Sequence, residues 1–247
     1  MQETIVTSRL DLDSYSPDEV FFCPEESRFY SQCIEKMVFT RSTPFDTIVE
    51  FGAGDGSPVI DALLKSHFHG TIHGYELNPS AVRVARSRID KYGLKHRYII
   101  HDRCFYQNFP DRTRYLIANP PYLPAPDNDL YLPALHGGID GATVSKQLLS
   151  MNSENVLLML SAYSNPIETV EHAIAEGYQI VDFTVSPLPF GYYSNEPKVK
   201  RSIAKLREEG KAFYSSNIYF LAGTLFRKKY PENINISAEF LQVMTAL

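Results

Sequence analysis

The stretch Val-Glu-Phe-Gly-Ala-Gly-Asp-Gly-Ser-Pro, residues 49–58, decides the fold of this chain. An apolar segment, residues 45–51, leads into it, and a helical pattern over residues 57–65 leads out of it. Glycines at alternate positions let the backbone turn tightly and approach a ligand closely, because glycine has no Cβ. Ser57 is expected to cap the helix, and Pro58 suits its first position. The sequence therefore predicts a strand, a glycine-rich turn and a helix in direct succession.

Apolar strands and amphipathic helices alternate along the rest of the chain. Further strands are expected at residues 71–76, 97–101, 114–118, 155–162, 178–185 and 215–227, and helices at residues 78–92, 142–150, 166–176 and 197–209. Strands that alternate with helices need crossover connections, which favour a parallel sheet covered on both faces. Because two strands close the series, the last edge is expected to be antiparallel. The predicted fold class is α/β: a doubly wound, mostly parallel seven-stranded sheet with an antiparallel edge strand.

Three parts of the chain are expected from this pattern. Residues 1–44 form an N-terminal segment whose helix, opening at Pro24 with Glu25 and Glu26 in its first turn, packs over the ligand site. Residues 45–229 form the α/β domain, in which residues 186–216 are an insertion that could act as a lid over the substrate. Residues 230–247 form a tail. Its last stretch, residues 237–247, fits a small amphipathic helix capped by Ser237.

Composition places the chain among ordinary globular proteins. Of 247 residues, 44% are hydrophobic and 21% charged, and no apolar run is long enough to cross a bilayer. The N-terminus lacks the basic start and apolar stretch of a signal peptide, and the three cysteines share no metal-ligand spacing. A cytoplasmic protein with reduced thiols and no bound metal is expected. A net charge of −5 does not favour a polyanionic partner, although basic stretches at residues 81–114 and 198–211 leave a nucleic acid open.

Acidic side chains follow three successive strands of the predicted sheet. Glu50 ends the first strand, Glu76 the second and Asp102 the third. In open α/β sheets, ligands bind beyond the carboxyl ends of the strands. There, Glu76 can accept both hydroxyls of a ribose, and Asp102 can accept a hydrogen bond from an adenine amino group. Taken alone, each carboxylate is equally compatible with a helix cap or a solvated loop; three in this order favour a nucleoside site.

The spacing of the glycines excludes an ordinary dinucleotide. Gly52 and Gly54 match the Gly-x-Gly-x-x-Gly pattern of dinucleotide folds, but the third glycine, Gly56, comes one place early. Glu50, just before the turn, would oppose a pyrophosphate and would suit a cation. The sulfonium and ammonium groups of S-adenosyl-L-methionine are such cations. We therefore predict that S-adenosyl-L-methionine is the cofactor and that these glycines hold it.

The fourth strand runs directly into Asn119-Pro120-Pro121-Tyr122. One reading is structural, since two prolines can simply end a strand. The chemical reading explains all four positions. The Asn119 side-chain oxygen and the Pro120 carbonyl accept the two N–H groups of a planar nitrogen, Pro121 removes a competing donor, and Tyr122 offers a face for stacking. Asn119, Pro120 and Tyr122 are thus the predicted catalytic residues, Pro121 and Tyr122 bind substrate, and Asn119 also contacts the cofactor.

These motifs resemble those of the class I S-adenosylmethionine-dependent methyltransferases. The resemblance rests on residues 50–56, Glu76, Asp102 and residues 119–122, and spans residues 24–227. In that class, the Asn-Pro-Pro-Tyr motif marks enzymes that act on glutamine amides, on exocyclic amines of adenine or cytosine, and on guanine. The resemblance implies N-methylation of a planar nitrogen.

A finer resemblance is to the release-factor glutamine methyltransferases. Residues 135–141, Leu-His-Gly-Gly-Ile-Asp-Gly, are similar to a segment that follows the catalytic motif there, and residues 23–27 to one ahead of the cofactor fold. In that family both segments line the site, which implies that Gly138 contacts substrate. The bacterial members carry a helical N-terminal domain that has no counterpart here, whereas shorter eukaryotic and archaeal relatives lack it. The insertion, residues 186–216, is longer than expected, and Tyr192 within it is a candidate substrate contact.

Four functions stay open from the sequence. The first is methylation of a glutamine amide in a protein substrate such as a release factor. The second is methylation of a nucleobase in RNA or DNA, for which the basic stretches speak. The third is N-methylation of a small metabolite beneath a closing lid. The fourth is a binding protein that has kept the fold without catalysis, which the intact motif at residues 119–122 disfavours.

Overall fold

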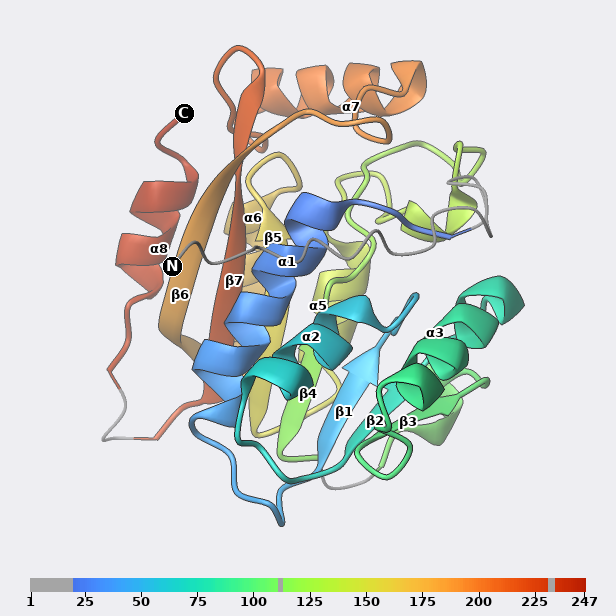
Figure 1. The fold of residues 1–247 in the computed structure, drawn as a ribbon. Coiled ribbons are helices and arrows are strands. Elements are labelled where there is room, and N and C mark those ends of the chain that lie inside the picture. The colour runs from blue at the N-terminus through green and yellow to red at the C-terminus, as the bar shows by residue number, and fades with distance from the viewer. Residues whose placement is uncertain (1–19, 111–112, 231–233) are drawn as a thin grey trace, which may run out of the picture.

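The computed structural model describes residues 20–110, 113–230 and 234–247. In these ranges a single seven-stranded sheet has the order β3-β2-β1-β4-β5-β7-β6 (Figure 1). The strands are β1 (Ile48–Phe51), β2 (Ile72–Tyr75), β3 (Tyr98–His101), β4 (Tyr115–Ala118), β5 (Asn155–Ser161), β6 (Tyr178–Pro189) and β7 (Ile218–Lys228). The pairs among β1 to β5 are parallel, and those of β7 with β5 and β6 are antiparallel. The predicted fold class is confirmed.

The antiparallel pairing lies at the predicted end of the sheet, with one difference in detail. β7, the antiparallel strand, occupies the position inside the edge, and β6 forms the edge itself. β6 also runs to Pro189 instead of ending at residue 185, because residues 186–189 pair with residues 218–221 of β7. The first residues of the predicted insertion are therefore strand.

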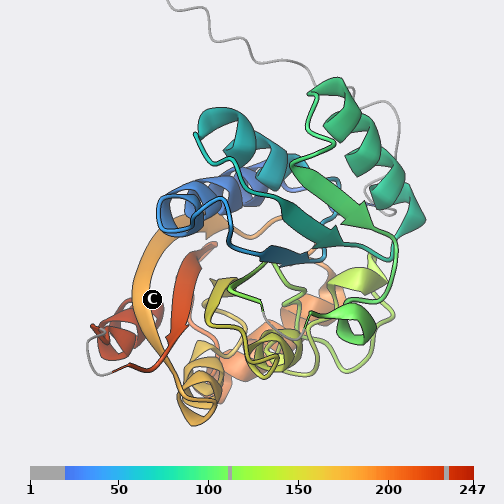
Figure 2. The same cartoon turned by 90° about the horizontal axis from the view of Figure 1, so that it is seen from below.

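Helices cover both faces of the sheet, as Figure 2 shows from below. The helices are α1 (Pro24–Cys33), α2 (Ser57–Lys65), α3 (Pro79–Lys91), α4 (Phe105–Asn108), α5 (Thr143–Leu149), α6 (Pro166–Ala175), α7 (Pro197–Glu208) and α8 (Ser237–Met244). α1, α2 and α3 pack together on one face, and α5, α6 and α8 on the other. α7 lies at the end of the molecule where β5 finishes (Figure 1). No helix among the described residues is long and apolar enough to cross a membrane.

α1 buries the stripe that its sequence predicts. Tyr30, Cys33 and Ile34 are buried, and so are Met37 and Val38 in the π-helical segment that continues the helix to Phe39. This spacing places one apolar face against the sheet. The helix thereby packs along the sheet, beside α2 and against β6 and β7 (Figure 1).

Two predicted helix caps are wrong. α2 is capped by Gly56 in the left-handed conformation (φ +74°), and the Asp55 carboxylate accepts a hydrogen bond from Ser57 N at 2.9 Å. Ser57 is thus the first helical residue. Ser237 likewise begins α8 after Ile236, and its hydroxyl accepts a hydrogen bond from a β6 amide, which anchors the helix to the sheet. In both helices a side chain two residues earlier accepts the hydrogen bond of the first helical amide: Asp55 from Ser57 N, and Asn235 from Ser237 N.

Candidate active site

A cavity of about 640 Å³ opens beyond the carboxyl ends of β1, β2 and β4. Its walls come from segments far apart in the chain: the glycine turn and the loops after β2, β3 and β4 on one side, and the start of α1 and the loop before α7 on the other. This is the place where open α/β sheets bind ligands. The predicted site residues that line it are Glu50, Gly52, Gly54, Glu76, Asn119, Pro120, Pro121, Tyr122 and Tyr192.

The glycine turn presents its backbone to the cavity. Gly52 (φ +66°) and Gly54 (φ +56°) line the cavity, and a Cβ at either position would meet no atom within 4 Å. Gly56 does not line it. A Cβ there would stand 3.3 Å from both Ala85 Cβ and Tyr98 Cε1, so Gly56 serves the close packing of α2 and its cap. The structure thus gives Gly56 a packing role, and its predicted contact with the cofactor stays a prediction.

Glu50 is a buried carboxyl group at the floor of the cavity. It is 1% exposed and accepts hydrogen bonds from the hydroxyls of Tyr98 and, at 3.4 Å, Tyr30. Burial raises the pKa of Glu50 to about 8, against the two tyrosine hydrogen bonds, which lower it. A cation entering the cavity would favour the ionised form, which fits the predicted role of this residue.

Glu76 is held by backbone amides at the end of β2. Its Oε2 accepts a hydrogen bond from Gly54 N at 2.8 Å, and its Oε1 accepts from Leu77 N and Asn78 N, both at 2.8 Å. These bonds fix the carboxylate beside the glycine turn, where it lines the cavity. Its contact with ribose hydroxyls remains a prediction.

Asp102 lies outside the cavity wall, and its predicted contact with adenine stays a prediction. Its side chain is 63% exposed, pairs with Arg86 of α3 at 3.3 Å, and is absent from the cavity wall. The ion pair and solvent satisfy the carboxylate outside the site. Beyond β3 it is the next residues, Arg103 and Cys104, that reach the cavity together with the start of α4.

Asn119 is the most distinctive residue of the site. It follows β4 directly, and its side-chain Oδ1 is buried without a hydrogen-bond partner among the described residues. An unsatisfied buried acceptor costs about 1–3 kcal/mol. Asn119 and the next residues, Pro120, Pro121 and Tyr122, all line the cavity. The structure thus brings together the whole predicted catalytic motif.

The ring of Tyr122 forms part of the cavity wall and is itself held in place. It packs against Tyr163 with ring centroids 5.9 Å apart, and its hydroxyl donates a hydrogen bond to Glu26 of α1. Glu26 also accepts a hydrogen bond from the Tyr219 hydroxyl of β7 at 3.3 Å. From the sequence, Glu26 is expected to lie in the first helical turn, within the segment of residues 23–27 that the family resemblance places at the site. Nothing in the local pattern distinguishes it from exposed Glu25 beside it.

The segment Gly137–Gly141 supports the catalytic motif from behind. The Gly137 amide donates to Leu123 O at 2.9 Å, and a Cβ on Gly137 would stand 2.6 Å from Tyr122 Cα. Gly138 (φ +95°) does not line the cavity, because it packs against the side chain of Thr143. This segment therefore packs against the backbone after Asn119, and the predicted substrate contact of Gly138 stays a prediction.

Aromatic side chains of the predicted insertion, together with residues 20–23, form one wall of the cavity, here called the roof. Tyr192 lines the cavity while remaining 56% exposed, and its ring centroid lies 5.2 Å from those of Tyr131 and Tyr193. The Tyr193 hydroxyl accepts a hydrogen bond from Phe22 N at 3.2 Å. The roof is therefore continuous from residues 20–23 to residues 188–194, two segments that are remote in sequence.

The loop after the catalytic motif is tied to the start of α7. Lys198 forms ion pairs with Asp127 at 2.6 Å and Asp129 at 3.3 Å, and Glu196 accepts a hydrogen bond from Tyr131 N at 2.9 Å. Within the described part of the chain, no cluster of three or more His, Cys, Asp or Glu residues could hold a metal ion.

Comparison with known proteins identifies the fold. No protein-family model and no curated protein matches the sequence. A solved structure from Pyrococcus horikoshii, assigned as an RNA methyltransferase, matches with a TM-score of 0.58 and 12% identity over 88% of this chain and 91% of that one. The fold is that of the S-adenosylmethionine-dependent methyltransferases.

Other solved methyltransferases share this fold. A ribosomal protein L11 methylase from Lactobacillus delbrueckii subsp. bulgaricus matches with a TM-score of 0.52 and 11% identity, over 87% of this chain and 84% of that one. A protein from Galdieria sulphuraria, assigned as a sarcosine dimethylglycine methyltransferase, matches with a TM-score of 0.50 and 12% identity, over 83% and 86%. The names of these proteins imply unrelated methyl acceptors, so the methyltransferase fold does not select the acceptor of this chain.

Proposed function

We propose that this chain is an S-adenosyl-L-methionine-dependent N-methyltransferase that acts on a planar nitrogen. The observation that carries the proposal is the Asn119 Oδ1 atom, buried without a partner beside a cavity that the glycine turn also lines. A buried acceptor left unsatisfied in the protein alone is a natural partner for an N–H group of a substrate.

The residues at the end of the cavity formed by the glycine turn fit the cofactor. Its volume of about 640 Å³ lies in the range of about 300–1,000 Å³ typical of ligand pockets. Gly52 and Gly54 leave open space where side chains would project, and the carboxyl groups of Glu50 and Glu76 suit an ammonium group and a ribose. When bound, S-adenosyl-L-methionine supplies an electrophilic methyl group on a cationic sulfur.

The residues of the Asn119–Tyr122 motif activate and orient the acceptor. A planar nitrogen is a poor nucleophile because its lone pair is delocalised. In the proposal, Asn119 Oδ1 accepts one N–H and the Pro120 carbonyl the other, which pushes electron density onto the nitrogen. Pro121 offers no competing amide donor, and the Tyr122 ring holds the planar group. Orientation of this kind can contribute on the order of 7–11 kcal/mol, and the proton lost from the product can pass to water.

For the acceptor, we propose a glutamine amide of a protein such as a release factor. The support is the likeness of residues 135–141 to that family's segment and the shortage of cations around the cavity. Arg103 is the sole Lys or Arg among the described residues that line it, and it stands at the cofactor end. A polynucleotide acceptor would call for phosphate contacts, and the wall around Asn119 offers acidic and aromatic groups instead.

One observation favours a small-molecule acceptor as the second candidate. Part of the cavity wall is aromatic, with Phe21, Tyr163 and Tyr193 among its lining residues, and the Tyr193 hydroxyl accepts a hydrogen bond from Phe22 N. An enclosed aromatic wall suits a flat molecule that fits wholly inside the cavity. Turnover of free amides or aromatic amines without turnover of protein substrates would favour this candidate.

The variant Asn119→Ala tests the central role. We expect its affinity for S-adenosylhomocysteine, measured by calorimetry, to stay within about threefold of the unmutated chain. Methyl transfer should fall by on the order of 10²-fold or more, as when one preorganised polar group is removed from other active sites.

Asn217→Ala provides a matched control, because Asn217 is exposed and lies outside the cavity wall. It should leave both properties unchanged. If Asn119→Ala weakens cofactor binding as strongly as it slows transfer, the role assigned to Asn119 is wrong.

A further inference from the structure

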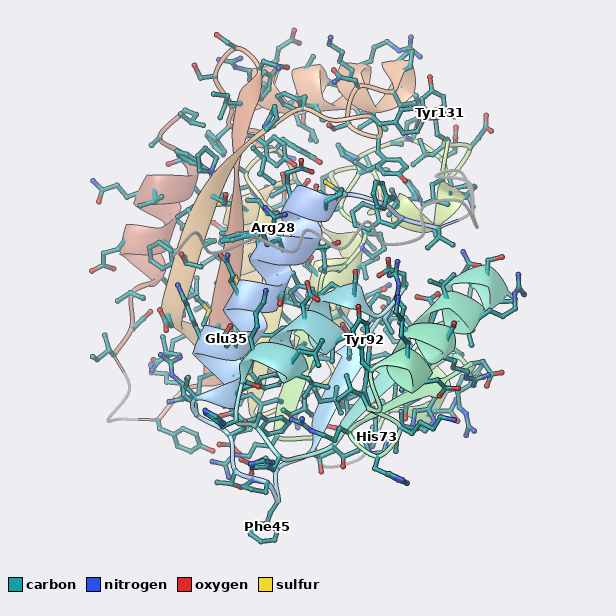
Figure 3. The ribbon with its side chains drawn as sticks, in the orientation of Figure 1. Arg28, Glu35, Phe45, His73, Tyr92 and Tyr131 are labelled. Atoms are coloured by element: carbon teal, nitrogen blue, oxygen red, sulfur yellow. The ribbon has the colours of Figure 1, made fainter. Side chains whose placement is uncertain are left out.

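Two exposed tyrosines stand at the opening of the cavity, and the proposed reaction does not use them. Tyr131 is 45% exposed, and its ring centroid lies 5.2 Å from that of Tyr192, with an angle of 31° between the ring planes. Tyr192, a candidate substrate contact from the sequence, lines the cavity, whereas Tyr131 lies outside its wall. Figure 3 shows Tyr131 beside α7, on the outside of the molecule. The pair therefore extends the aromatic roof outward.

Both tyrosines project from backbone whose neighbouring side chains are anchored in the core. Leu130 and Leu132, on either side of Tyr131, are buried, and so is Tyr193 next to Tyr192. The two exposed rings are thus held in place by the buried residues beside them. Large apolar side chains that gather at the surface mark interaction sites more often than single ones do.

A buried carboxyl group also braces this pair of rings. Glu196 is 6% exposed and accepts a hydrogen bond from Tyr131 N at 2.9 Å, which fixes the Tyr131 backbone to the start of α7. The loop that carries Tyr192 leads directly into the same helix. A tyrosine has only two side-chain torsions, so a braced tyrosine loses little entropy when a partner binds it. The pair is therefore a preorganised binding surface.

The charges beside Tyr131 favour a polypeptide over a polynucleotide as the partner. Asp127 and Asp129 lie in the same loop, and both pair with Lys198, at 2.6 Å and 3.3 Å. The hydrogen bond from Lys198 lowers the pKa of Asp127, so this carboxylate is ionised at neutral pH. The Asp129 side chain is 97% exposed. Two carboxylates that share Lys198 leave a negative charge beside the rings, which opposes a phosphate backbone.

We propose that Tyr131 and Tyr192 form an outer acceptor subsite, which binds the polypeptide segment next to the methylated glutamine of a protein acceptor. The subsite rests on the proposed function, because it continues the cavity that receives the glutamine amide. An acceptor small enough to fit within the cavity does not reach Tyr131, so contact with both rings selects a longer chain.

The variant Tyr131→Ala tests the subsite with two acceptors, a release factor and N-acetylglutamine amide. For the release factor, we expect KM to rise on the order of tenfold and kcat to stay within about threefold, because the outer contact binds the chain without taking part in the reaction. Turnover of N-acetylglutamine amide should be unchanged. Tyr131→Phe keeps the ring and should hold KM for the release factor within about threefold of the unmutated chain.

Tyr230→Ala is the matched control, because Tyr230 is also exposed and lies outside the cavity wall. It should leave the kinetics of both acceptors unchanged. An unchanged KM for the release factor in Tyr131→Ala, or an equal loss with the free amide, would overturn the subsite. Because α7 also exposes Lys200 and Arg201, RNA is a third probe. Methylation of RNA that depends on Tyr131 would overturn the assignment to a polypeptide.

A second measurement detects binding without methyl transfer. In the chain labelled with 3-fluorotyrosine, the fluorine signals of Tyr131 and Tyr192, assigned through Tyr131→Phe and Tyr192→Phe, should shift when unlabelled release factor is added. The signal of Tyr230 should stay in place. Shifts without methylation would count against the proposed function alone. Methylation of the release factor without these shifts would refute the subsite alone, and the absence of both would refute both.

Discussion

At the scale of single residues, the two carboxylates beside the glycine turn differ in what satisfies them. Glu76 accepts three backbone amides and is fixed in place. Glu50 is buried deeper, and its partners among the described residues are tyrosine hydroxyls, which compensate less for lost hydration. The protonation of Glu50 therefore couples to folding.

This coupling predicts the pH dependence of stability. The ordinary pKa of 4.5 rises to about 8 in the folded protein, chiefly through burial. Between these values the folded chain holds a proton that the unfolded chain has lost, so this residue lowers stability as pH rises. In Glu50→Gln the free energy of unfolding should fall less between about pH 5 and about pH 8 than in the unmutated chain. Urea unfolding of both chains at both pH values measures this. The same change in the free energy of unfolding with pH in the two chains would refute it.

Single residues also differ in how far the sequence reveals their place in the site. Asn119 and its neighbours could be recognised because their chemistry is local and contiguous. Glu26 could not, because its partner Tyr219 lies 193 residues further along the chain and only the fold brings them together. Asp102 lies at the end of a strand, as expected, but the sequence could not show that its side chain pairs with Arg86 outside the cavity wall.

At the scale of elements, the helices and strands follow the apolar periodicity closely. The prediction for residues 57–65 matches α2, and α3 is capped by Asn78, whose side chain accepts a hydrogen bond from Ser80 N at 2.9 Å. The end of β6 was missed, because residues 186–189 include two prolines and pair only through the remote strand β7. Local pattern predicts where an element forms better than how far tertiary pairing extends it.

The supporting segment behind Asn119 gives a prediction at this scale. Gly141 has a φ of +79°, and a Cβ there would stand 2.5 Å from Tyr122 O and 2.9 Å from Ser164 Cβ. Gly141→Ala should lower the free energy of unfolding by about 1–3 kcal/mol, through backbone strain and overpacking. Gly191→Ala is the control, since a Cβ at Gly191 meets nothing within 4 Å. Chemical denaturation of both variants decides, and equal stability of the two would contradict the tight packing.

At the scale of the whole molecule, the sheet order explains how the site is assembled. β1 and β4 are neighbours, so the glycine turn after β1 and Asn119 after β4 emerge side by side. The start of α1 and the loop before α7 then close over them, joined through Phe22 and Tyr193. The part of the cavity formed by the glycine turn and Glu76 was predictable from motifs at strand ends. The wall formed by residues 20–23 and 188–194 was not, because it depends on contacts between segments far apart in the chain.

The structure of a complex with S-adenosylhomocysteine tests this arrangement most directly. The nucleoside should lie between the turn at Gly52–Gly54 and the carboxylate of Glu76, with its sulfur directed toward the side of the cavity that holds Asn119 Oδ1. A nucleoside bound elsewhere, or one whose sulfur points away from Asn119, would contradict the proposed methyl transfer.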